Sequence, residues 1–149
     1  MLTGLLHVHS LLRYVLLILL LISIVKAFSG WLGKKPFTDG TRKLGLFTLI
    51  SAHLQLVIGL ALYFMNGWQN VLGDMENRVN RFFSMEHSLM MILAIALITI
   101  GYSSSKKGKT DEAKYKRIAI FFLAALIIIF LMIPWPWKEL GRGWMPGMQ

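Results

Sequence analysis

The polar residues that could do chemistry in this chain lie inside or beside long apolar runs. They are four histidines and one arginine: His7, His9, His53, His87 and Arg13. Ionisable side chains within membrane-spanning segments are costly, so each is by default a candidate for function. Imidazole binds metal ions and haem iron, and a guanidinium group grips carboxylates in a bidentate manner. These residue types make a bound cofactor the chemistry to consider.

Depth along the helices decides which histidines can act together. His9 and His87 each lie about five residues inside the outer end of an apolar run, which is ~7.5 Å along a helix axis. His53 lies about twelve residues from the outer end of its run, or ~18 Å. A haem held by two histidines needs both imidazoles at one level on facing helices. We therefore expect His9 and His87 to ligate iron and His53 to line a deeper site.

Arg13 is one helical turn from His9 and on the same face. Two interpretations stay open: the side chain extends toward the outer interface, or it pairs with an anion inside the bundle, such as a haem propionate. His7 and His9 are two residues apart, so on a helix they point in opposite directions and do not share a metal. We expect His7 to be an interfacial residue in water.

Four apolar runs, each close to the ~20 residues that cross a bilayer, define the fold class. We predict an all-α integral membrane protein, a four-helix up-down-up-down bundle forming a single domain over residues 1–149. The predicted helices cover residues 5–29, 42–65, 81–103 and 114–134. A soluble helical bundle would need polar outer faces at helical spacing, which these runs do not show.

The net charge of +9 is concentrated in two loops, at residues 34–43 and 106–117. Loops rich in Lys and Arg stay in the cytoplasm, so both termini are predicted outside, in a multi-pass protein of the inner (cytoplasmic) membrane. We therefore interpret the charge first as a signal for orientation in the membrane. Attraction to anionic lipid is a second effect of the same residues. We expect no nucleic-acid partner. The absence of cysteine excludes thiolate metal sites and covalently attached haem, but leaves non-covalent haem open.

A short repeat accompanies the basic loops. The pattern Lys-Lys-x-x-Thr-Asp occurs at residues 34–39 and again at residues 106–111, and His-Ser-Leu occurs at 9–11 and 87–89. Duplication of a helical hairpin and chance recurrence both explain these matches. Under duplication, a two-fold axis along the membrane normal would make His9 and His87 face each other across the bundle.

Several blocks of the sequence together resemble a known family. They are LHVHSLLRY, TRKLGLFTLISAH, MEHSLMM and IPWPWKELGRGWMPG, and they span nearly the whole chain. In this set the chain resembles the small four-helix bacterial membrane proteins called cytochrome B or cytochrome b-like, and more weakly the b561-like four-helix cytochromes. The resemblance implies a b-type haem on histidines chosen from His9, His53 and His87.

The sequence therefore predicts a membrane electron carrier that binds haem b. His9 and His87 are the expected ligands, Arg13 the partner of a propionate, and His53 a residue of a deeper site with quinone as the candidate ligand. A quinone-linked oxidoreductase activity is compatible with this arrangement, and the expected partner is another membrane or respiratory subunit. The rival hypothesis is a cofactor-free accessory or scaffold subunit of a larger membrane complex.

Overall fold

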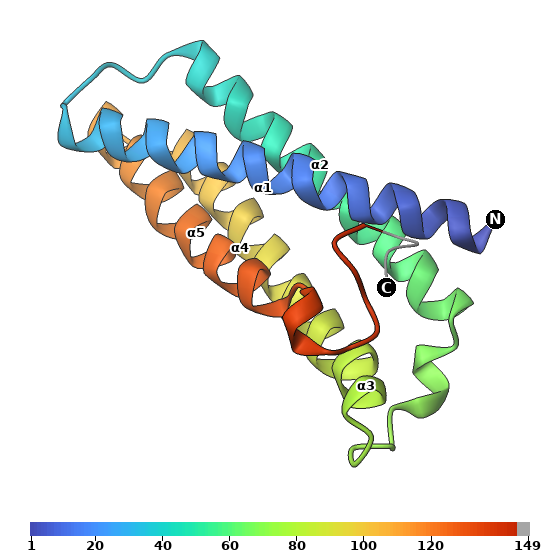
Figure 1. The fold of residues 1–149 in the computed structure, drawn as a ribbon. Coiled ribbons are helices and arrows are strands. Elements are labelled where there is room, and N and C mark those ends of the chain that lie inside the picture. The colour runs from blue at the N-terminus through green and yellow to red at the C-terminus, as the bar shows by residue number, and fades with distance from the viewer. Residues whose placement is uncertain (146–149) are drawn as a thin grey trace.

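Four long α-helices form the body of the protein in its computed structural model, which describes residues 1–145 (Figure 1). The long helices are α1 (Leu2–Leu32), α2 (Asp39–Met65), α4 (His87–Lys106) and α5 (Asp111–Met132). The shorter elements are η1 (Trp68–Val71), α3 (Arg78–Arg81), the π-helical turn η2 (Phe82–Glu86) and η3 (Pro136–Lys138). No strand occurs within residues 1–145, which confirms the all-α prediction.

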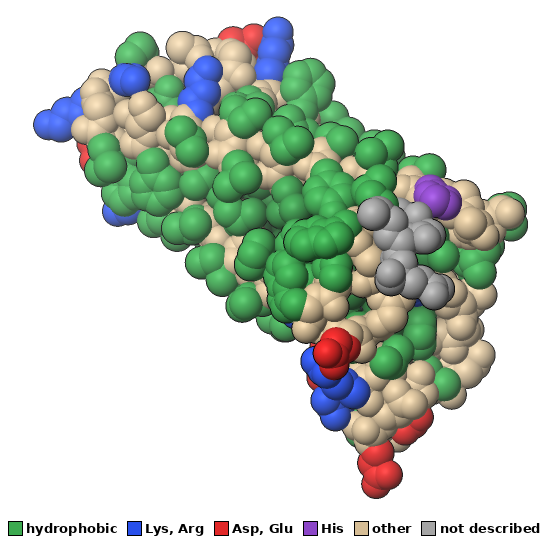
Figure 2. Space-filling model, viewed as in Figure 1, with side chains coloured by type: hydrophobic (Ala, Val, Ile, Leu, Met, Phe, Trp, Pro, Cys, Tyr) green, Lys and Arg blue, Asp and Glu red, His purple; other side chains and the backbone are tan. Residues whose placement is uncertain are grey.

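All four long segments, with α3, η2 and α4 counted as one, are long and apolar enough to cross a membrane. Within their most apolar stretches only 17–33% of residues are buried inside the protein. Large apolar side chains therefore cover the outer surface, as Figure 2 shows along the middle of the molecule. Such a surface is matched to hydrocarbon rather than to water.

The helices begin earlier than predicted because polar capping residues precede the apolar runs. The predicted starts at residues 42, 81 and 114 correspond to observed starts at residues 39, 78 and 111. The hydroxyl groups of Thr38 and Thr110 accept hydrogen bonds from the backbone amides of Thr41 and Ala113, which have no partner within the helix. The two copies of Lys-Lys-x-x-Thr-Asp are thus both loop-and-cap segments, whatever their origin.

The helices form a ring in which α1 packs against α2 and α5, and α4 packs against the same two helices. α1 and α4 therefore face each other diagonally across the interior. Figure 1 shows the four helices close together at the end that carries the α1–α2 and α4–α5 loops. Toward the other end the α1–α2 pair diverges from the α4–α5 pair, and the C-terminal segment crosses between them (Figure 1).

Glycines allow the close approach at the narrow end. A Cβ atom at Gly30 of α1 would lie 2.3 Å from the ring of Tyr115 on α5. The Tyr115 hydroxyl donates to the Pro36 carbonyl over 2.8 Å, which fixes that ring in place. At Gly101 of α4 an added Cβ would lie 2.7 Å from the Cβ of Phe121. The narrow end is therefore held by contacts that leave no room for a methyl group.

Replacing Gly30 by alanine should destabilise the bundle by about 1–3 kcal/mol, because the methyl group must displace the buried ring of Tyr115. The measurement is thermal unfolding in a mild detergent. Gly4→Ala is the matched control, since a Cβ there meets nothing within 4 Å. Equal stability of the two variants would contradict the packing described for the narrow end.

Candidate functional site

A cavity of about 330 Å³ lies at the end of the bundle where Figure 1 shows the two helix pairs diverging. Side chains from α1, α2, α4, the end of α5 and the C-terminal segment line it. His9, Arg13 and His87 border this cavity, as the sequence predicts, and the exposed His7 borders it as well. Its volume is within the range of cofactor and small-ligand sites.

His87 is fixed by a backbone carbonyl of a neighbouring helix. Its Nδ1 lies 2.7 Å from the carbonyl oxygen of Met132, at the end of α5. That carbonyl would normally accept from the amide of residue 136, which is a proline without an N–H group. Because the carbonyl can only accept, Nδ1 carries the proton and the lone pair is on Nε2. His87 is thus held in the tautomer that coordinates a metal through Nε2.

The π-helical turn η2 ends directly before His87. The amide of His87 bonds to the carbonyl of Phe82, five residues back, so the turn contains one more residue than an α-helical turn. The inserted residue rotates the rest of α4, whose Met91 and Ile95 border the cavity one and two turns after His87. Glu86 pairs with Arg81 over 2.8 Å and does not bond His87.

His9 occupies the opposite side of the cavity, where it packs against α2. A Cβ atom at Gly59 would lie 3.2 Å from His9 Cε1, so glycine provides the space for the imidazole. Gln55 Nε2 donates to the backbone carbonyl of His9 over 2.8 Å. His9 Nδ1 and Gln55 Oε1 are buried with no hydrogen-bond partner in residues 1–145. Buried polar atoms are nearly always satisfied, so these two atoms indicate that a ligand or water completes the site.

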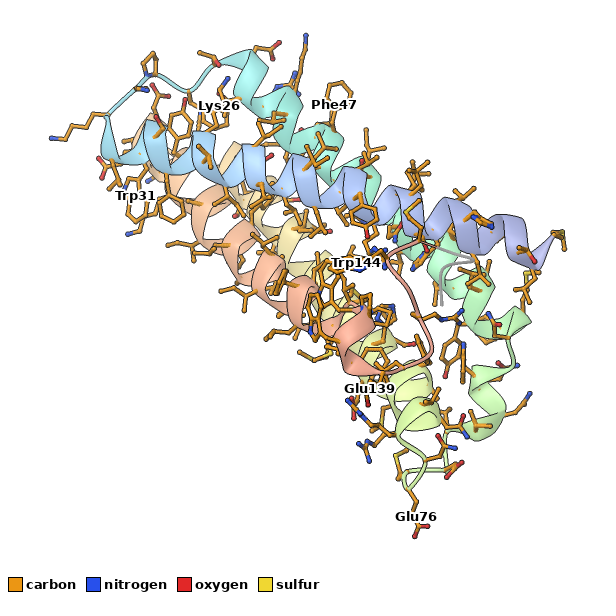
Figure 3. The ribbon with its side chains drawn as sticks, in the orientation of Figure 1. Lys26, Trp31, Phe47, Glu76, Glu139 and Trp144 are labelled. Carbon is orange, nitrogen blue, oxygen red and sulfur yellow. The ribbon has the colours of Figure 1, made fainter. Side chains whose placement is uncertain are left out.

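Arg13 ties the C-terminal segment to α1. Its guanidinium and the hydroxyl of Tyr14 both donate to the carbonyl of Trp144, each over 2.7 Å. Figure 3 shows Trp144 in the space between α1 and α5. Arg13 Nε is buried and has no partner among the described residues. Arg13 therefore uses Nη2 for hydrogen bonds within the protein, while Nε has no partner among the described residues.

A second arginine, Arg142, reaches the cavity from the C-terminal segment. Burial lowers the pKa of its guanidinium from the usual value, but arginine remains protonated at neutral pH. The described residues that line the cavity include no aspartate or glutamate. Two guanidinium groups with no carboxylate in the described lining give the cavity a positive potential, which favours an anionic ligand.

His53 lies outside this site. Its side chain is exposed on α2, and Nδ1 bonds to the carbonyl of Leu49 in its own helix over 2.9 Å. Gln55, two residues further on, points to the opposite side of α2 and borders the cavity. The structure thus brings His9, Arg13 and His87 together, and separates them from His53.

Side chains also satisfy the other free carbonyls at the end of α5. The carbonyl of Phe130 loses its donor at Pro134 and accepts from the indole of Trp135 over 2.8 Å. The ammonium group of Lys138 donates to the carbonyl of Leu131. Trp135 also stacks on Trp137 at 5.0 Å between ring centroids. This packing directs the C-terminal segment back across the cavity.

Comparison with known proteins gives no match, whether with family models, curated proteins or solved structures. The site is therefore assigned from its own residues. Within residues 1–145 there is no group of three or more His, Asp or Glu side chains that would hold a metal ion by themselves.

Sequence reasoning missed Arg142, Gly59 and the Met132 carbonyl as parts of the site. Arg142 follows the end of α5 by ten residues, and only the return of the chain brings it near α1. Pro134 and Pro136 could have indicated free carbonyl groups at Phe130 and Met132, because each proline lacks the backbone N–H that would bond to the carbonyl four residues before it.

Replacing Trp135 by phenylalanine should destabilise the protein by about 1–3 kcal/mol, because the partly buried carbonyl of Phe130 loses its donor. The measurement is the unfolding midpoint in detergent. Trp137→Phe is the matched control, since Trp137 is 58% exposed and forms no side-chain hydrogen bond in the described part of the chain. Equal unfolding midpoints for the two variants would show that the bond from the Trp135 indole to the Phe130 carbonyl does not stabilise the protein.

Proposed function

We propose that this protein is a membrane electron carrier that binds a b-type haem between His9 and His87. The observation that carries the proposal is their position: they come from diagonally opposed helices and border one cavity. A haem iron takes two axial ligands from the protein, so two imidazoles are a sufficient set. When bound, haem supplies reversible one-electron transfer at its iron, and the protein supplies binding and tuning.

Both histidines fit the role of axial ligand. The bond from His87 Nδ1 to the Met132 carbonyl leaves Nε2 free and fixes the ring. His9 lies against Gly59 with no partner for its buried Nδ1 among the described residues. Measured from the observed helix starts at Leu2 and Arg78, the two differ by two residues, or ~3 Å along the helix axes.

The two arginines fit the carboxylates of such a cofactor. Arg13 and Arg142 both line the cavity and meet no carboxylate in its described lining. Each would hold a propionate, and their charge would favour the reduced, less positive state of the site. The apolar lining, with Leu16, Met91 and Ile95, limits the access of water.

The proposed setting is the bacterial inner membrane, with the basic loops in the cytoplasm and both termini outside. The resemblance of the blocks LHVHSLLRY and MEHSLMM to cytochrome b-like proteins supports the cofactor, since they contain His9, Arg13 and His87. The carrier needs an electron donor and an acceptor, for which quinone and a respiratory subunit are the candidate classes. His53 is not given a role, because its exposed ring bonds its own helix.

The first test is the visible spectrum of protein purified in mild detergent from cells grown with ample haem. We expect a sharp α-band on reduction with dithionite and about one haem per chain. His9→Ala and His87→Ala should each abolish it, because each removes one axial ligand. His53→Ala is the matched control and should retain the band, and His7→Ala tests the other histidine at the cavity.

A featureless spectrum of the folded protein would overturn the proposal and favour the cofactor-free scaffold subunit. Loss of the band in His53→Ala but not in His9→Ala would place the haem elsewhere. Circular dichroism of each variant separates loss of the cofactor from loss of the fold.

Arg13→Gln and Arg142→Gln should each lower the midpoint potential of the bound haem, on the order of tens of millivolts, because a nearby positive charge favours the reduced form. A potentiometric titration followed at the α-band measures this shift. Arg78→Gln removes an exposed arginine on α3, outside the cavity, and should leave the potential unchanged. Equal potentials in all three variants would contradict a role for the cavity arginines.

A further inference from the structure

A second concave surface lies at the opposite end of the bundle, in a groove lined by α1, by Lys35 of the α1–α2 loop and by Tyr115 of α5. Its volume is about 440 Å³, and its floor is formed by Gly30 and Tyr115, the tight contact of the narrow end. The cavity between His9 and His87 shares no lining residue with this groove. The groove therefore needs an explanation of its own.

One part of the groove is apolar and exposed on the surface of α1. Leu21, Ile22 and Val25 line it, and they are 51%, 49% and 67% exposed. Ile22 and Val25 are three residues apart and share one face of α1. They lie seven to eleven residues before the end of α1 at Leu32, within the stretch that is apolar enough to span a membrane. Their neighbours in a membrane are hydrocarbon chains.

The other part of the groove presents two ammonium groups. Lys26 lies one turn after Ile22 on the same face, and its exposed side chain forms no hydrogen bond or ion pair with any described residue. Figure 3 shows Lys26 on α1, near the end that carries the α1–α2 loop. Lys26 is six residues, or ~9 Å, from the end of the helix at Leu32, so its side chain can reach the level of lipid headgroups.

A tight turn holds Lys35 against the same face. The amide of Lys35 bonds to the carbonyl of Gly30 over 3.0 Å, and the amide of Lys34 bonds to that of Trp31. These two bonds form the Schellman motif, which ends a helix with a residue of positive φ. Here that residue is Lys34, with φ 49°, a conformation in which glycine is usual. The ammonium of Lys35 then donates to Ser29 Oγ over 2.9 Å at the rim of the groove.

The surroundings of the groove are strongly basic. Residues 34–43 and 106–117 contain ten Lys and Arg against three Asp and Glu. Asp39, one of the three, is engaged by Arg42 and Lys43 at 2.8 and 3.2 Å. The described lining of the groove contains no carboxylate. Figure 2 shows Lys and Arg side chains gathered at this end of the molecule.

We propose that this groove binds one molecule of an anionic phospholipid. Lys26 and Lys35 contact the phosphate and the anionic headgroup, and an acyl chain lies along Leu21, Ile22 and Val25. Basic pockets between helices at the membrane surface recognise lipid headgroups in this way. A soluble phosphate would use the two lysines and leave the apolar half of the groove without a function.

The test is native mass spectrometry of the full chain in mild detergent, with dioleoyl phosphatidylglycerol added as the probe. Phosphatidylcholine with the same acyl chains is the neutral comparison. We expect one phosphatidylglycerol to be retained at concentrations where phosphatidylcholine is not. The double variant Lys26→Gln/Lys35→Gln should lose about tenfold or more in affinity, because both headgroup contacts are removed.

Lys107→Gln/Lys109→Gln is the matched control, because it removes the same charge from the same end of the molecule but outside the groove. Its affinity should change less than about threefold. Equal losses in the two double variants would show general attraction to a basic surface and overturn the proposal. So would equal retention of the two lipids, or displacement of phosphatidylglycerol by glycerol 3-phosphate at comparable concentration, since the latter would show a site for a soluble anion. None of these outcomes depends on haem.

Discussion

The unpaired carbonyl groups at the end of α5 are the constraint on which the rest of the site depends. Pro134 and Pro136 remove the backbone donors that Phe130 and Met132 would use in a continuous helix. An exposed carbonyl is costly in an apolar environment, so other groups must replace those donors. The indole of Trp135 and the imidazole of His87 do so. The bond from Trp135 turns the chain back toward the bundle. The bond from His87 fixes the imidazole that the proposed function needs.

The two ends of the bundle solve different packing problems. At the narrow end, Gly30 and Gly101 let neighbouring helices approach until a methyl group no longer fits. At the wide end the cavity lies between the pairs, and the C-terminal segment closes the gap through the bonds of Arg13 and Tyr14 to Trp144. Tight packing is rigid, so these contacts hold the helices together at the narrow end, and the cavity lies at the other end of the bundle.

Positive charge has different surroundings at the two ends of the bundle. At the wide end Arg13 and Arg142 are partly buried beside a cavity, where a low dielectric strengthens their effect on an enclosed anion. At the narrow end most of the lysines are exposed, where water and salt screen their field, and the proposed ligand is an anionic lipid headgroup. The net charge of +9 thus combines partly buried arginines at one end with exposed lysines at the other. Composition alone does not distinguish these two groups.

The sequence by itself determined the four helices, because apolar runs of membrane-spanning length leave the backbone no other way to satisfy its hydrogen bonds. It also predicted that His9 and His87 lie at similar depth, since depth along a helix depends only on the rise per residue, and both border one cavity. Only the tertiary structure decided that Gln55 rather than His53 faces the cavity and that Arg142 joins it. The helical period shows that 53 and 55 point apart, but it does not say which one faces inward. A residue beyond the last helix is placed by where the chain turns, and side-chain bonds to the free carbonyls of α5 set that turn.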